Sequence, residues 1–143
     1  MASKPTKATL NGIADRWGGG GAIKESIQKD GFLGVPSVFL SGLGAIGEYG
    51  LSPAETLLVL QLMSHKWDAR APFPSYKRLA YRMGVSEPYA RKLARSLEEK
   101  GLLKRIERVG STNRFSLEPL FAILEEKAQA SNEARLLKDE PNF

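Results

Sequence analysis

Hydrophobic residues in the middle of the chain are dense enough to predict a helix buried on most of its sides. From Pro53 to about Trp67 and Asp68, apolar side chains occupy nearly every helical face. Ser52 suits the N-cap, Pro53 the first helical position, and Glu55 the acidic position of a capping box. We therefore expect the central core helix of the protein in this segment.

Two shorter amphipathic helices are predicted between Pro74 and Gly101. The first follows Ser75 as N-cap and ends at Gly84, a residue type that adopts the left-handed conformation ending many helices. The second follows Ser86 and ends at Gly101. Because the connection is only about three residues long, the two helices have to cross steeply, which is the helix-turn-helix arrangement.

The second of these helices has two contrasting faces. Its inward positions are small or apolar, namely Ala90, Leu93, Ala94 and Leu97. Its outward positions carry hydroxyl, aromatic and basic side chains, namely Ser86, Tyr89, Arg91, Lys92 and Arg95. A helix of this kind suits the major groove of DNA, where basic side chains recognise base edges and phosphates.

A β-hairpin is predicted directly after the helix pair. Residues 102–109 alternate loosely between apolar and polar, 110–113 are turn-forming, and 114–117 form the returning strand. Three apolar side chains are expected to anchor the hairpin to the core: Leu103, Ile106 and Phe115. The basic, polar tip favours contact with phosphate or the minor groove, although a hairpin that only closes the sheet would have the same pattern.

These segments resemble a known family. Five residues have the spacing of the helix-turn-helix signature: Ala80, Gly84, Val85, Ala90 and Leu93. The stretch EEKGLLKRIERVGSTNRFSLEPLF resembles the wing of winged-helix domains. Residues from roughly Val35 to Glu126 are similar to domains of bacterial, phage and plasmid replication-initiation proteins and transcriptional regulators. The resemblance implies a mainly α fold with a small β-hairpin wing, the winged helix-turn-helix, and DNA binding as a class.

Fourteen residues make up the predicted DNA-binding site. They are Ser75, Tyr76, Lys77, Ser86, Glu87, Tyr89, Arg91, Lys92, Arg95, Arg108, Ser111, Thr112, Asn113 and Arg114. Arg91 is the first choice for a base contact, because a guanidinium can hold guanine O6 and N7 with two hydrogen bonds. Lys92 and Arg95 are expected to hold phosphate. Tyr76 either packs or lies near a phosphate at a helix N-terminus, and Glu87 either accepts from cytosine or only serves the helix dipole.

The segment before this domain is expected to be a flexible N-terminal arm, residues 1–34. Four consecutive glycines, 18–21, cost backbone entropy to order. Trp17 either docks on the domain or on a second subunit, or is an exposed residue of the arm. A short helix is indicated over Ala22–Lys29, whereas Phe32–Leu43 fits either a helix or a strand.

The winged-helix domain is expected over residues 35–127, and a C-terminal tail over 128–143. A last helix is predicted from Glu118, with an apolar stripe up to Ala128. It either covers its own core or pairs with a second copy of the chain in a homodimer. After about Ser131 the polar, acidic sequence, interrupted by Leu136 and Leu137, favours either a frayed end or a tail that binds a partner.

Charge reinforces the nucleic-acid interpretation. The chain of 143 residues has a net charge of +5. Residues 75–114 hold eleven Lys and Arg against four acids, 11 − 4 = +7, and residues 115–143 hold three against six, 3 − 6 = −3. The basic charge therefore lies on the predicted helix pair and wing, as phosphate neutralisation requires.

Other chemistries find little support in the sequence. With no cysteine and a single histidine, His65, neither a typical zinc site nor a thiol nucleophile is expected, and we predict no enzyme activity, metal or cofactor. Residues 42–47 match G-x-G-x-x-G, but Gly50 and Pro53 interrupt the long helix that a dinucleotide site needs. No run of 18 apolar residues and no apolar signal core occur, so we expect a cytoplasmic, nucleoid-associated protein with no membrane contact.

The sequence thus favours a sequence-specific double-stranded DNA-binding protein that regulates transcription of a bacterial gene or mobile element. The alternative that the resemblance implies is a plasmid or phage replication-initiation or segregation protein bound to an origin or a centromere-like site. Replication or transcription proteins would be its partners in either role. A winged-helix module that binds only proteins is a further alternative, although it would leave the basic helix face without a purpose.

Overall fold

The computed structural model describes residues 12, 15–16, 20–46, 50–65, 74–107, 110 and 113–139. The chain divides into two units, Met1–Gly34 and Val35–Phe143, each of which is described by itself. Within the described residues, no helix is long and apolar enough to span a membrane.

The first unit contains the helix α2 (Gly21–Asp30), which confirms the short helix predicted over Ala22–Lys29. None of its residues is buried, and an ion pair joins Lys24 to Asp15 at 2.6 Å. Trp17, for which the sequence allows either docking or exposure, lies outside the described residues.

The second unit opens with the short helix α3 (Ser37–Leu40), so the helix and not the strand is correct in this region. Phe39 of α3 is fully buried in the core. A 3₁₀ turn, η1 (Leu43–Ala45), follows, and the Leu51 N–H donates to the Leu43 carbonyl at 2.8 Å. This bond brings η1 next to the residues that directly precede the next helix.

The central core helix is α4 (Pro53–Ser64). Its predicted capping box is present, because the Glu55 N–H donates to the Ser52 hydroxyl at 3.1 Å and the Ser52 N–H donates to the Glu55 carboxylate at 2.9 Å. The helix ends at Ser64, earlier than the predicted end near Trp67 and Asp68, which lie outside the described residues.

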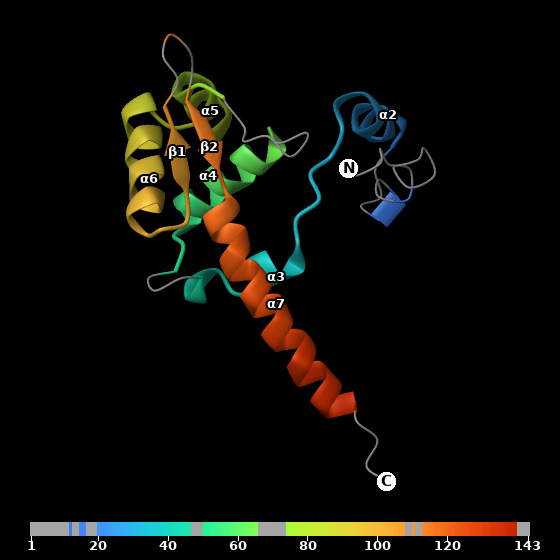
Figure 1. The fold of residues 1–143 in the computed structure, drawn as a ribbon. Helices are drawn as coiled ribbons and strands as arrows, with labels where there is room; N and C mark the ends of the chain where they lie inside the picture. Colours follow the sequence, from blue (N-terminus) through green and yellow to red (C-terminus); the bar gives the residue numbers. More distant parts are fainter. Residues whose placement is uncertain are drawn as a thin grey trace. The chain divides into compact units, whose positions relative to one another are not determined.

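The predicted helix pair is present as α5 (Tyr76–Met83) and α6 (Glu87–Glu99). Both helices end in the same way. Gly84 and Gly101 have φ of 71°, and the N–H of the residue after each donates to the carbonyl five residues back, as in a Schellman motif. α4, α5 and α6 pack against one another as a three-helix core (Figure 1).

The wing is an antiparallel pair of strands, β1 (Lys104–Ile106) and β2 (Arg114–Ser116), with Arg105 opposite Phe115. Leu103 and Phe115 are buried and anchor the wing, as predicted. The prediction was wrong for Ile106, which is 41% exposed. Because side chains alternate along a strand, Ile106 lies opposite Arg114 on the face that points away from Phe115.

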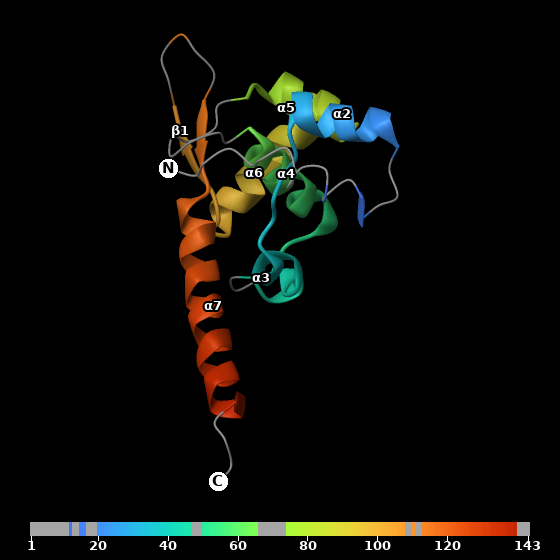
Figure 2. The ribbon, with the colours of Figure 1, turned by 90° about the vertical axis from the view of Figure 1, so that its right-hand side faces the viewer.

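The last helix, α7 (Glu118–Asp139), begins as predicted but continues well past Ser131, so the expected frayed end is wrong. Leu120 and Leu124 of its first half are buried in the core. Its second half extends away from the three-helix core in both views (Figures 1 and 2), and Leu137 there is 72% exposed. The polar sequence reflects this exposure, while its alanine and leucine content favours a helix.

Candidate nucleic-acid interface

The outward side of α6 carries most of the contact residues predicted on this helix. Ala90, Leu93, Ala94 and Leu97 are buried on its inner side, as the periodicity predicts. Its predicted contact residues Tyr89, Arg91, Lys92 and Arg95 are all exposed. Within the described part of the chain, Lys92 and Arg95 form no ion pair, so their charges remain open to a ligand.

The beginning of α6 is fixed by its own cap. The Ser86 hydroxyl accepts from the Tyr89 N–H at 3.2 Å. Glu87 and Pro88 occupy the first turn, where Pro88 has no N–H that the helix needs. The acidic Glu87 is favourably placed at the positive end of the helix dipole.

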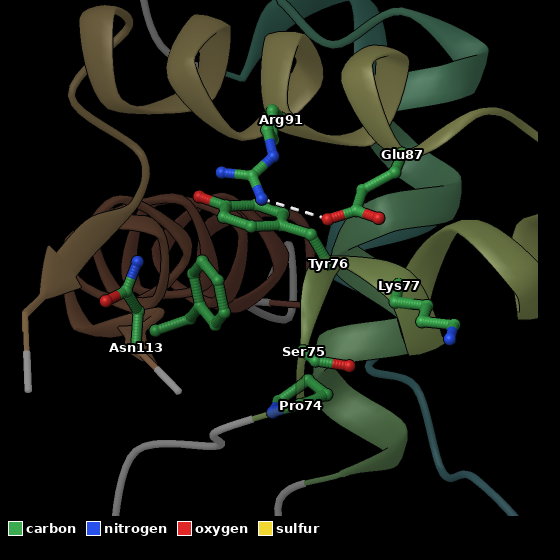
Figure 3. A pocket seen from close by; sticks show the side chains of 8 residues that line it. Pro74, Ser75, Tyr76, Lys77, Glu87, Arg91 and Asn113 are labelled. Atoms are coloured by element: carbon green, nitrogen blue, oxygen red, sulfur yellow. Dashed lines mark hydrogen bonds and ion pairs between the residues drawn. The ribbon is translucent and has the colours of Figure 1, made fainter. Parts of the chain in front are cut away.

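Arg91 is held from two sides. Its Nη2 atom donates to the Glu87 carboxylate at 2.9 Å, and its guanidinium lies over the ring of Tyr76, 4.7 Å from the ring centroid (Figure 3). The side chain of Arg91 is nevertheless about half exposed, at 52%. Its guanidinium is therefore ordered and accessible at once.

Tyr76, at the start of α5, connects α6 to the wing. Its ring meets that of Phe115 edge-on, with centroids 5.6 Å apart and planes at 76°. Arg105 of β1 lines a small pocket together with Tyr76 and Glu98, and forms an ion pair with Glu98 of α6 at 3.4 Å. The neighbouring Tyr76 hydroxyl, followed by the charge of Glu98, raises the pKa of Arg105 against the opposing effect of desolvation.

A pocket of about 230 Å³ lies where the start of α5, the start of α6 and the wing converge (Figure 3). Its lining residues are Pro74, Ser75, Tyr76, Lys77, Glu87, Arg91, Asn113 and Phe115. Six of these eight belong to the predicted binding site, drawn from three separate stretches of sequence. The fold therefore brings these stretches together around Arg91.

The start of α5 offers donors for an anion. The Ser75 hydroxyl accepts from the Arg78 N–H at 3.1 Å and so caps the helix, as predicted. Lys77, in the first turn, is exposed. A helix N-terminus beside a lysine favours phosphate, because both carry positive charge.

The predicted wing contacts are described only in part. Asn113 and Arg114 are half-buried, and Asn113 faces the pocket. Arg108, Ser111 and Thr112 lie outside the described residues. Their predicted contact with DNA stays a prediction.

Arg105 belongs to this region although the sequence reasoning gave it no role. It lies two residues after the buried Leu103, on the strand face that points towards Tyr76, where an apolar residue would be the usual expectation. A basic residue at an inward position of the strand was the only signal that could have revealed it.

A second group that the sequence did not reveal lies on the outer side of α5. Arg78 donates to the His65 ring at 3.2 Å, and Arg82 donates to the Gln61 side chain at 2.7 Å. Because the acceptor groups are on α4, distant in sequence, neither pairing was predictable from spacing. Tyr81, between the two arginines, is 87% exposed.

Residues 49–103 match the family described as "Helix-turn-helix domain". This match covers α4, α5 and α6, and the wing of β1 and β2 directly follows it. The chain therefore contains a winged helix-turn-helix DNA-binding domain, with the mainly α fold and small β-hairpin that the sequence predicted.

Solved structures give further comparisons. The N-terminal domain of DnaD protein from Geobacillus kaustophilus HTA426 is similar at 26% identity and a TM-score of 0.57, over 78% of this chain and 94% of that one. The transcriptional regulator PA3341 is 25% identical, with a TM-score of 0.41 over 94% of this chain and 83% of that one. A MarR-family transcriptional regulator from Rhodococcus sp. RHA1 is 17% identical, with a TM-score of 0.39 over 98% of this chain and 88% of that one. No curated protein matches the chain in sequence.

Proposed function

We propose that this protein is a sequence-specific double-stranded DNA-binding protein that regulates transcription of a bacterial gene or mobile element. The observation that carries the proposal is the outward face of α6, where Arg91, Lys92 and Arg95 are exposed beside a basic wing and a pocket at the start of α5. A domain with a purely structural role would gain nothing from a concentration of positive charge on this one face.

The residues divide into two roles in this proposal. Arg91 reads a guanine in the major groove through O6 and N7, which typically discriminates against a wrong base by about 1–3 kcal/mol. Lys92, Arg95 and Lys77 contact phosphates and so set the position of α6 on the duplex without reading sequence. The wing residues Asn113 and Arg114 extend the contact along the neighbouring backbone or minor groove.

The same geometry serves the alternative role, recognition of an origin or a centromere-like site by a replication-initiation or segregation protein. The two roles share the chemistry of reading and differ in where the bound sequence lies. Mapping the bound sequence onto its source DNA separates them, since a regulator binds next to a promoter and an initiator binds at an origin.

We further propose that the protein acts as a homodimer, with a second copy seated against the second half of α7. That half is exposed within the unit, and an isolated helical segment of this length is only marginally stable in water. Pairing with a second copy would stabilise it and match a two-fold DNA site.

Selection from random duplexes at two salt concentrations tests the proposal. We compare the wild type with Arg91→Ala/Arg95→Ala, and use Lys24→Ala/Lys29→Ala as a control that removes the same charge from the first unit. We expect a defined motif that the first variant loses and the control keeps, and weaker binding at the higher salt. Binding without any selected motif would contradict sequence-specific recognition, and absence of binding at both salts would favour a protein-interaction module.

A further inference from the structure

Tyr76 is a residue for which the sequence predicts either packing or a phosphate contact. Its ring is engaged on two sides within the domain. The ring face lies under the Arg91 guanidinium, the ring contacts Phe115 edge-on, and Arg105 lines a small pocket together with Tyr76. This leaves little of Tyr76 for a phosphate, and places it between the recognition helix and both strands of the wing.

We propose that Tyr76 is a positioning residue that holds the Arg91 guanidinium for base recognition and makes this position depend on the wing. The proposal rests on the proposed function, in which Arg91 reads a base. It assigns specificity at one base pair to a residue that itself touches no base.

Arg91 is held in one conformation before DNA binds. An arginine side chain has many rotamers in solution, and fixing one of them on binding costs conformational entropy. Here the guanidinium is already held by Glu87 at 2.9 Å and by the Tyr76 ring at 4.7 Å. A bidentate contact with guanine needs a defined guanidinium plane, and stacking on an aromatic ring supplies one.

Tyr76 is also in contact with the wing. Phe115 of β2 is 1% exposed, so the edge-on contact with Tyr76 is anchored in the core. Arg105 of β1 lines a small pocket beside Tyr76 and pairs with Glu98 of α6 at 3.4 Å. A displacement of either strand therefore changes the position of the Tyr76 ring, and with it the orientation of the Arg91 guanidinium plane.

Two substitutions separate the ring from the hydroxyl. Tyr76→Leu removes the stacking surface, whereas Tyr76→Phe keeps the ring and removes only the hydroxyl. Each substitution is made both in the wild-type chain and in the Arg91→Ala variant. Discrimination is measured by competition between the selected duplex and one altered at the base pair whose preference Arg91→Ala loses.

We expect Tyr76→Leu to lower discrimination at this base pair by about two- to fivefold, the range for an exposed cation–π contact. Tyr76→Phe should restore most of it. In the Arg91→Ala background Tyr76→Leu should have no further effect, because the group that it positions is gone. Thermal unfolding identifies any variant that is not folded. If Tyr76→Leu does not fold, Tyr76→Met replaces it.

Three results would overturn the inference while leaving the proposed function intact. They are unchanged discrimination in Tyr76→Leu, an equal loss of binding to all duplexes, and a loss that persists in the Arg91→Ala background. The last two would identify Tyr76 as a structural residue or a phosphate contact. If Arg91→Ala itself does not relax any base preference, the proposed function fails first, and the inference fails with it.

Discussion

Glu55 is a charged side chain in the interior of the domain, with an exposed fraction of only 3%. It accepts from the Ser52 N–H at 2.9 Å, from the Ser96 hydroxyl at 2.8 Å and from the Lys100 ammonium at 2.6 Å. Lys100 also donates to the Gly50 carbonyl at 3.1 Å. One carboxylate thus joins the start of α4 to the end of α6, the helix that carries the exposed basic side chains Arg91, Lys92 and Arg95.

The pKa of Glu55 determines how the domain responds to acid. Burial by itself raises this pKa, but the hydrogen bonds from Lys100, Ser52 and Ser96 together outweigh it, and the pKa is lowered. A carboxylate with a lowered pKa contributes stability that is complete above the unfolded pKa of about 4.3 and is lost as the pH falls through the folded pKa.

We expect Glu55→Gln to lower the free energy of unfolding at pH 7 by about 3 kcal/mol, because it leaves Lys100 partly buried without a charged partner. The variant should also lose less stability than the wild type between about pH 5 and pH 3. Urea denaturation at several pH values measures both effects. Glu125→Gln on the exposed side of α7 is the control, and an equally large change there would contradict the role given to Glu55.

Turns between elements depend on two glycines with the same backbone conformation and different surroundings. Gly50, before α4, and Gly84, between α5 and α6, both have φ of 71°. A Cβ atom at Gly50 would lie 2.5 Å from the Gly44 carbonyl oxygen, whereas a Cβ atom at Gly84 would meet nothing within 4 Å. The first glycine is required by contact and conformation, and the second by conformation alone.

We expect Gly84→Ala to destabilise the domain by about 1–2 kcal/mol, which is the cost of a left-handed alanine. Gly50→Ala should cost clearly more, since the backbone around Gly44 also has to move. Chemical denaturation of the two variants under identical conditions gives the comparison. Equal losses would show that the close approach of Gly44 has no energetic consequence.

The elements themselves were largely predictable from local sequence, because caps, glycines and periodicity act within one helix or turn. Ser52, Ser75 and Ser86 correctly predicted where three helices begin. Gly84 and Gly101 correctly predicted where α5 and α6 end. Interactions between elements were not predictable in the same way. The stack of Arg91 on Tyr76 and the ion pair of Arg105 with Glu98 depend on how α5, α6 and the wing pack, which no spacing rule reveals.

At the scale of the whole chain, the charges are separated along the sequence and serve different purposes. The excess of +7 over residues 75–114 lies on the helix pair and wing, and the balance of −3 over residues 115–143 lies mostly on α7. The acidic excess of α7 lies in its first half, whereas residues 129–139 hold two acids and two basic residues. The second half therefore has no net positive charge to attract DNA and is better suited to contact protein. The exposed Leu136 and Leu137 in that half have the same implication.

Removing residues 131–143 tests whether this half of α7 joins two copies. We expect the full chain to sediment as a dimer and the truncated chain as a monomer, and the selected DNA motif to change from a palindrome to a half-site. The truncated domain should unfold at nearly the same denaturant concentration as a dilute, dissociated sample of the full chain, because Leu136 and Leu137 contribute nothing to the core.

Leu136→Glu/Leu137→Glu should reproduce the dissociation without shortening the helix. Ala130→Gln, an exposed change earlier on α7, tests how far along the helix the contact extends. A full chain that stays monomeric at high micromolar concentration and selects a half-site would contradict the homodimer, and DNA recognition would then be the work of a single winged helix.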